Sequence, residues 1–182
     1  TQQDIRFSYT DPRNGKTVVV PQKGRLTLPA RDMKILEANV PVADKIMKYC
    51  TSEILDIFRI GKRTVIVLYG PQDTAGEAAF ELSDKPQVIT TGDYSWDEKK
   101  NELRINYQHG QNDHMIRLDD IQLVIVNKER AYRSWSFSQS QENFLLLSDC
   151  YILKDYEFNE DKLSMEVESS SGDSDISLMM SK

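Results

Sequence analysis

Short runs of apolar and polar residues alternate along most of this chain, and the clearest example is the stretch 53–83. Three β-rich runs follow one another there, with Gly61-Lys62 between the first two and Gly70-Pro71 after the second. Runs of this kind separated by turn residues predict a meander of antiparallel strands. The middle run, 64–69, is apolar on both faces, so we expect a central strand that is covered on two sides. The third run, 77–82, alternates apolar and polar positions.

The same pattern continues on both sides of this stretch. Residues 5–9 and 16–20 predict a hairpin, because the turn residues 11–15 between them include Pro and Asn-Gly. The stretch 43–58 partly fits helical spacing, but its β-rich centre 49–51 and the hairpin after it favour strands. Further strands are predicted at 25–28, 87–91, 103–107, 115–118, 121–126, 144–147, 150–153, 163–167 and 176–180.

About fifteen short strands without a long helix predict an all-β fold. We expect antiparallel hairpins and sheets that are contiguous with an immunoglobulin-like β-sandwich subdomain. A chain of 182 residues supports one domain, 1–182. Within it, we expect a hairpin and meander part at 1–91 and an immunoglobulin-like part at 92–182.

Composition excludes several classes of protein. The net charge is −6 and no basic stripe is visible, which argues against nucleic acid as a partner. No apolar run is long enough to predict a membrane span. The amino terminus has no initiating Met and no signal-peptide core, so we expect a processed chain or an excised fragment. Cys50 and Cys150 both lie in apolar, strand-like runs, which favours two buried free thiols over a disulfide.

Carboxylates offer the first candidates for chemistry. A glycosidase needs two of them on opposite sides of a bond, about 5 to 9.5 Å apart. Glu53, Asp56, Glu77 and Glu81 qualify by type only. Because Glu77 and Glu81 fall on the polar face of an alternating strand, we expect both to be solvated.

No metal, cofactor or nucleophile site is predicted. His109 and His114 lack the spacing of a zinc site, so we expect two surface loop histidines. The acidic stretch 155–166 faintly resembles a calcium loop, but Glu160 stands where the loop needs Gly, so a hairpin turning at 159–161 is expected. The chain has no nucleophile elbow, phosphate-binding loop or dinucleotide fingerprint, and no catalytic residue is assigned.

Aromatic residues are the remaining candidates. Tyr94, Trp96 and Trp135 lie in polar surroundings. Exposed rings beside polar groups can stack on a sugar, so these three residues are candidates for carbohydrate contact. The alternative is that they pack at a sheet edge or against a neighbouring domain.

Several short segments resemble those of family-35 glycoside hydrolases, the β-galactosidases, in the same order. The chain has ARDMKI at 30–35 for the family's GRDSKI, YCTSEIL at 49–55 for YSTAEVL, TVIVLYG at 64–70 for TVLVLYG, GEAAF at 76–80 for its GE…F strand, AYRSW at 131–135 for TAYRFW, and YILK at 151–154 for PYLVRS. It departs from the family at Ala30, which replaces Gly, and at 148–150, which replaces Gly-Pro.

In that family this region is the second domain, which follows a catalytic (β/α)₈ barrel. The resemblance implies a non-catalytic accessory β-domain that packs on a barrel absent from this chain, inside an exported glycoside hydrolase. The family's catalytic glutamates lie in the barrel, so none is carried over to this chain. Two alternatives stay open, a carbohydrate-binding module for galactosides or other glycans and an immunoglobulin-like adhesion or assembly domain unrelated to sugars.

Overall fold

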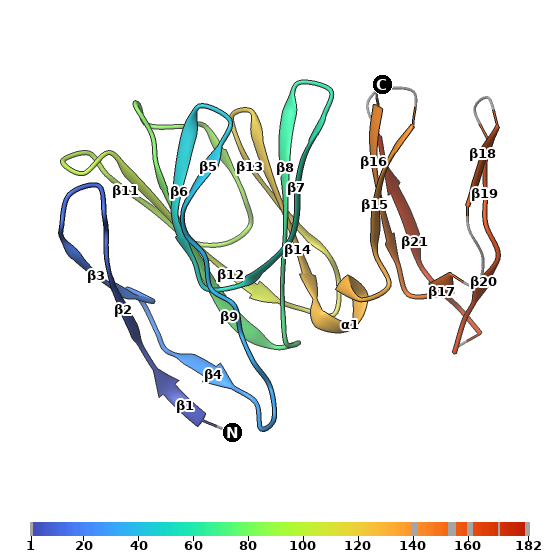
Figure 1. Cartoon of the computed structure of the whole chain (residues 1–182), viewed down its shortest axis with the longest axis horizontal. Coiled ribbons are helices and arrows are strands. Elements are labelled where there is room, and N and C mark those ends of the chain that lie inside the picture. The colour runs from blue at the N-terminus through green and yellow to red at the C-terminus, as the bar shows by residue number, and fades with distance from the viewer. Residues whose placement is uncertain (1, 140–141, 153–155, 160–161, 171, 181–182) are drawn as a thin grey trace.

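The computed structural model describes residues 2–139, 142–152, 156–159, 162–170 and 172–180. Strands dominate these residues, as predicted, and most of them lie in three layers (Figure 1). We name the layers the front sheet, the middle sheet and the third sheet.

Each of the first two layers has five strands. The front sheet has the order β11-β12-β9-β6-β5 and comprises β11 (Tyr94–Asp97), β12 (Glu102–His109), β9 (Thr74–Glu81), β6 (Lys45–Cys50) and β5 (Ala38–Val42). The middle sheet has the order β10-β13-β14-β8-β7 and comprises β10 (Val88–Ile89), β13 (His114–Leu118), β14 (Ile121–Asn127), β8 (Arg63–Gly70) and β7 (Glu53–Ile60).

The third sheet has the order β15-β16-β21, made by β15 (Trp135–Gln139), β16 (Glu142–Ser148) and β21 (Ile176–Met179). Two-stranded ladders flank the layers. They pair β1 (Gln2–Ile5) with β4 (Leu26–Leu28), β2 (Phe7–Thr10) with β3 (Thr17–Val20), β17 (Tyr151–Ile152) with β20 (Val167–Glu168), and β18 (Glu157–Asn159) with β19 (Lys162–Ser164). The last pair is the predicted hairpin around 159–161, although residues 160 and 161 lie outside the described residues.

Strand β8 is covered on both faces, as its apolar sequence predicts. Ile66 and Leu68 belong to the core between the middle and front sheets. Val65 and Val67 belong to a second core, which the third sheet closes with Leu145 and Leu147 among its residues. The middle sheet is therefore the inner layer of the three.

The predicted meander at 53–83 is wrong in its third strand. Strands β7 and β8 form an antiparallel hairpin, but β9 pairs with β6 and β12 in the front sheet. The other neighbour of β8 is β14, and that pair is parallel. β14 is buried along its whole length, which suits a strand in a sheet with both faces covered.

Three other sequence predictions are confirmed. The stretch 43–58 forms strands β6 and β7, and residues 11–15 connect β2 to β3 as a hairpin. Cys50 and Cys150 are buried free thiols.

The predicted subdivision at residue 91 falls between β10 and β11, and each five-stranded sheet takes strands from both sides of it.

Glu77 is buried, which corrects the expectation of a solvated side chain. Its carboxylate accepts hydrogen bonds from the backbone N–H groups of Gln22 (2.7 Å) and Lys23 (2.9 Å) and from the hydroxyl of Tyr49 (2.7 Å). The strand pattern places Glu77 on the outer face of β9, but the segment after β3 covers that face. Glu81, at the end of the strand, keeps its exposure and lies 3.1 Å from Arg13.

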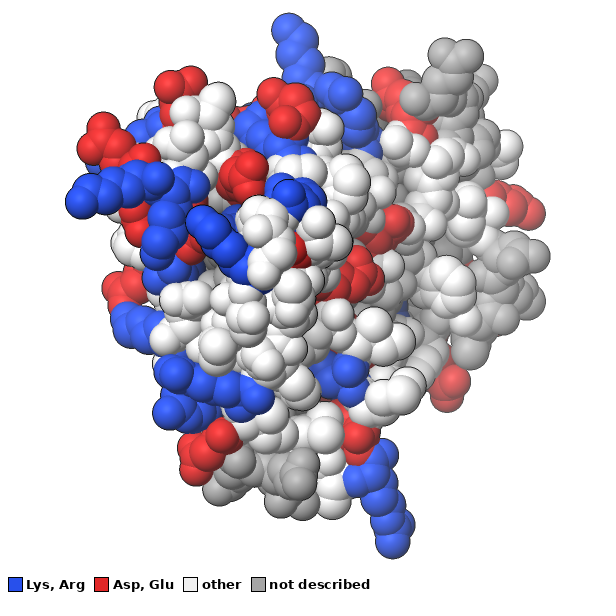
Figure 2. All heavy atoms as spheres, turned by 60° about the vertical axis from the view of Figure 1, so that its left-hand side comes forward, with Lys and Arg blue, Asp and Glu red and all other residues white. Residues whose placement is uncertain are grey.

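The helical content is small. Helix α1 (Lys128–Ala131) is the only helix in the described ranges, and nothing in those ranges forms a helix of the length and apolarity that a membrane crossing needs. On the face in Figure 2, basic and acidic side chains are interspersed.

Val67→Asp tests the inner position of β8. The new carboxylate would lie in the core under the third sheet without a partner, so we expect the free energy of unfolding to fall by about 4 kcal/mol or more. Val19→Asp, on the exposed side of β3, is the matched control and should change it by less than about 1 kcal/mol. Equal urea midpoints for the two variants would show that β8 is not covered.

Candidate functional site

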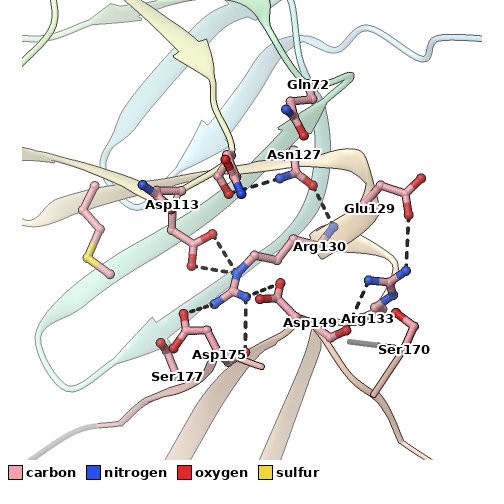
Figure 3. A pocket seen from close by; sticks show the side chains of 13 residues that line it. Gln72, Asp113, Asn127, Glu129, Arg130, Arg133, Asp149, Ser170, Asp175 and Ser177 are labelled. Atoms are coloured by element: carbon pink, nitrogen blue, oxygen red, sulfur yellow. Dashed lines mark hydrogen bonds and ion pairs between the residues drawn. The ribbon is translucent and has the colours of Figure 1, made fainter. Parts of the chain in front are cut away.

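A pocket lies between the middle sheet and the third sheet (Figure 3). It has a volume of about 580 Å³. Its wall is polar, with amide side chains near the β12–β13 turn and charged side chains from α1 and the third sheet. The residues are Gln72, Gln111, Asn112, Asp113, Met115, Asn127, Glu129, Arg130, Arg133, Asp149, Ser170, Asp175 and Ser177.

Arg130 is the centre of this pocket. Its Nε donates to Asp113 Oδ2 (2.9 Å), one Nη donates to Asp149 Oδ1 (2.6 Å), and the other donates to Asp175 Oδ2 (2.9 Å). The guanidinium is almost fully buried, with 4% of the side chain exposed. The three aspartates come from the β12–β13 turn, the β16–β17 turn and the loop before β21, so one cation joins the middle sheet to the third sheet.

Local sequence explains the position of Arg130. The side chain of Asn127 caps α1 by accepting a hydrogen bond from the backbone N–H of Arg130 (2.9 Å). This cap starts a single helical turn directly after β14. The turn points the guanidinium back under the sheet, toward the three carboxylates (Figure 3).

The cluster is electrostatically unbalanced. Three carboxylates surround one guanidinium, and Arg133 adds a second cation that donates to the backbone oxygen of Asp149 (3.2 Å). Burial raises the pKa of the Asp113 carboxyl, and the charge of Arg130 opposes that rise. Asp113 therefore takes up a proton more readily than an ordinary aspartate.

This arrangement favours a structural role over acid–base chemistry. A glycosidase needs one free general acid and one free base or nucleophile, whereas Asp113, Asp149 and Asp175 are all bound to Arg130. The amide-lined part of the wall can still form hydrogen bonds with a polar ligand. In the described part of the chain, no three His, Cys, Asp or Glu side chains are grouped closely enough to hold a metal ion.

The structure does not bring the three aromatic candidates together. Tyr94 and Trp96 lie two residues apart on β11, at the edge of the front sheet, where Trp96 packs against the main core. Trp135 lies on β15 of the third sheet, with 53% of its side chain exposed. The carbohydrate-contact residues predicted from sequence therefore occupy two separate surfaces. None of them lines the Arg130 pocket.

His109 is buried, which corrects the prediction of a surface loop histidine. It is the last residue of β12, and its ring is sealed between the sheets. Its Nδ1 lies 2.9 Å from the carbonyl oxygen of Val126, which can only accept, so Nδ1 carries the proton. Its Nε2 then accepts from the Ser52 hydroxyl (2.8 Å), which itself accepts from Tyr107 (2.8 Å). His114, by contrast, is partly buried on β13, 3.0 Å from Thr91.

The Ser52–His109 pair has the groups of a nucleophile and its base but no access to substrate. Both side chains are buried, and Gly70 and Gly76 pack directly against the rings of His109 and Tyr107. A Cβ on Gly70 would come within 2.7 Å of the His109 ring. The two glycines thus let the rings fill the space between the sheets, and the polar chain serves the fold.

Sequence reasoning missed both polar clusters. The residues around Arg130 are 17 to 45 positions apart, and no local motif joins them. The one available signal was Asn127 three residues before Arg130, a spacing typical of a helix cap.

Arg130→Ala removes the cation that contacts all three aspartates. We expect the free energy of unfolding to fall by about 3 kcal/mol, because the largely buried carboxylate of Asp113 would lose its counter-charge. The more exposed Asp149 and Asp175 would lose the contact that ties them to α1. Amide hydrogen exchange in β16 and β21 should accelerate more than in β12. Arg59→Ala, an exposed arginine on β7, is the control. If both variants have the same urea midpoint and exchange pattern, the cluster does not fasten the third sheet.

The buried His109 predicts a dependence of stability on pH. Burial lowers the pKa of His109 to about 4, below the value of about 6.5 in an unfolded chain. The unfolded chain therefore binds the proton first, and this contribution is complete above pH 6.5 and is lost as the pH falls toward 4.

Between pH 7 and 4.5 we expect a loss of about 2–3 kcal/mol from this residue. Urea unfolding should show a smaller loss for His109→Gln than for the parent over this range. His114→Gln is the control and should follow the parent. A parent whose stability is flat over this range would contradict the assignment of a neutral, buried His109.

Comparison with known proteins identifies the family. The family model described as "Beta-galactosidase, domain 2" matches residues 2–133. A "Probable beta-galactosidase B" from Aspergillus niger is 21% identical over 153 residues, which cover 81% of this chain and 15% of that protein. Proteins with the same description from Neosartorya fischeri and Aspergillus fumigatus are each 25% identical over 127 residues, 67% of this chain and 12% of theirs.

The chain thus spans only a small part of the length of these relatives. The family match covers β1 to α1 and stops just before the third sheet. It confirms the resemblance carried by the segments between residues 30 and 133. The chain belongs to the family of second domains of β-galactosidases.

Proposed function

We propose that this chain is a non-catalytic accessory domain of a β-galactosidase-like glycoside hydrolase, and that the outer face of its third sheet packs on the catalytic barrel. Family membership supports the parent enzyme class. The engagement of all three aspartates by Arg130 supports a non-catalytic role. The same family resemblance leads us to propose that the parent enzyme is exported.

One observation carries the packing proposal. The register of the third sheet places Trp135, Leu146 and Leu178 in one row, on the face opposite Leu145 and Leu147. Leu145 and Leu147 face the middle sheet, so the row of Trp135 faces away from it. We call this the outer face of the third sheet.

The outer face is apolar and partly open. Trp135 is 53% exposed, Ile176 42% and Leu178 38%. Phe137 is stacked on Phe144 on the same face, with ring centroids 5.2 Å apart. Phe144 and Leu146 on this face are already buried, so Trp135, Ile176 and Leu178 form its open part. Exposed apolar side chains that gather on one face mark a contact surface, because each gains about 1.5–3 kcal/mol when it is fully buried.

The charge distribution favours a particular kind of partner. Residues 135–182 contain ten Asp and Glu and three Lys and Arg, a net charge of −7, whereas residues 1–134 contain 19 and 20, a net charge of +1. The outer face therefore belongs to the acidic part of the chain. We infer that the partner surface is apolar at its centre and basic around it.

The test of the packing proposal uses the complete polypeptide that carries this chain. Trp135→Ser combined with Leu178→Ser should lower its thermal midpoint and expose the junction between barrel and accessory domain to proteolysis. Tyr94→Ser, an exposed aromatic at the edge of the front sheet, is the matched control and should change neither. A complete polypeptide without a barrel, or a double variant identical to the control, would overturn the proposal.

The non-catalytic role has a separate test. The chain alone should not hydrolyse aryl galactosides. Turnover that Asp113→Asn abolishes would assign catalysis to the Arg130 pocket instead. Titration with galactosides, read by tryptophan fluorescence, tests the alternative of a carbohydrate-binding module, and a change that Trp135→Ser removes would favour it over barrel packing.

A further inference from the structure

A second pocket lies under the amino-terminal hairpin, on the outside of the front sheet. It has a volume of about 230 Å³. Carbon atoms make up most of its wall, since the rings of Phe7, Tyr9 and Tyr49 line it together with Val20 and Leu36. The two tyrosine hydroxyls are engaged elsewhere, with the carbonyl oxygen of Lys48 and with Glu77, so the tyrosines offer the pocket mainly their rings.

Lys34 is one of the residues that line this pocket, together with Glu37 and Cys50. It is partly buried, and no described residue forms an ion pair with it. The nearby acids have other partners, because Asp32 binds Lys128 at 2.7 Å and Glu53 accepts the backbone N–H of Ile35 at 3.5 Å. Lys34 thus lies at a mainly apolar cavity and forms no ion pair with the described residues, Glu37 of the same lining included.

These surroundings change the chemistry of the amine. Burial lowers the pKa of Lys34 and outweighs the nearby Cys50, Glu53 and Asp32, which raise it, while the positive charge of Lys128 acts in the same direction as burial. The neutral amine is the nucleophilic form of lysine, and a larger share of Lys34 is in that form at neutral pH than of an exposed lysine. The apolar wall favours uncharged ligands over hydrated ones.

We propose that Lys34 is a site of imine formation with small apolar aldehydes that enter this pocket. The lone pair of Nζ attacks the carbonyl carbon, and proton transfer from nitrogen to oxygen gives a carbinolamine. Loss of one water molecule then forms the C=N bond. The step needs no oxidant or reductant, and it is independent of the proposed role in a glycoside hydrolase.

Benzaldehyde is a suitable probe, because it is a single aromatic ring with one aldehyde. The chain is incubated with it at pH 7 in the presence of cyanoborohydride, which transfers hydride to the imine carbon and fixes the adduct as a secondary amine. Peptide mass mapping then gives the labelling rate of each lysine. We expect Lys34 to be labelled several times faster than the exposed Lys62, because it lies against an apolar wall that can hold the ring of the probe.

Two variants separate the pocket from the amine. Lys34→Arg should remove this fast label and leave the label on Lys62 unchanged. Phe7→Ser opens the pocket wall and should bring the rate at Lys34 down to that of Lys62, whereas Val19→Ser, on the same hairpin but outside the pocket, should leave it fast. A rate at Lys34 no higher than at Lys62 in the parent chain would overturn the proposal. Protection of Lys34 by benzoate without fast labelling would overturn it too, and would indicate a site for apolar anions.

Discussion

Burial of the middle sheet on both faces is the constraint on which the rest of the structure depends. Strands β8 and β14 have apolar centres and are buried at nearly every position, so each face of their sheet needs a covering layer. The front sheet covers one face and the third sheet the other. The parallel pairing of β8 with β14 fits this position, because parallel strands occur where both faces are buried. The fold therefore has three layers of sheet, one more than a two-sheet β-sandwich.

Single charged side chains bind the outer segments of the chain to the two five-stranded sheets. Arg130 joins the third sheet to the middle sheet, and Glu77 holds the segment after β3 on the front sheet. Buried charges of this kind contribute little net stability compared with apolar contacts, but a misplaced partner leaves them unpaired at a high cost. Their main effect is to fix where each outer segment lies.

The polar clusters and the open surfaces have different roles. Ser52 and His109 are sealed in the core, and Arg130 is saturated with carboxylates, so the groups that resemble catalytic ones support the fold. The surfaces that can meet a partner lie elsewhere, on the outer face of the third sheet and in the pocket of Lys34. This division agrees with membership in a family of second domains, whose proposed work is to pack on a neighbour.

The sequence by itself determined the strands, the main turns, the two-sided burial of 64–69 and the family, because each depends on neighbouring residues or on short segments. Only the tertiary structure decided which strands pair, and it moved β9 into the front sheet. It also decided that Glu77 and His109 are buried and that Arg130 meets three distant aspartates. Alternation tells which face of a strand a side chain occupies, but whether that face is covered depends on segments far away in the chain.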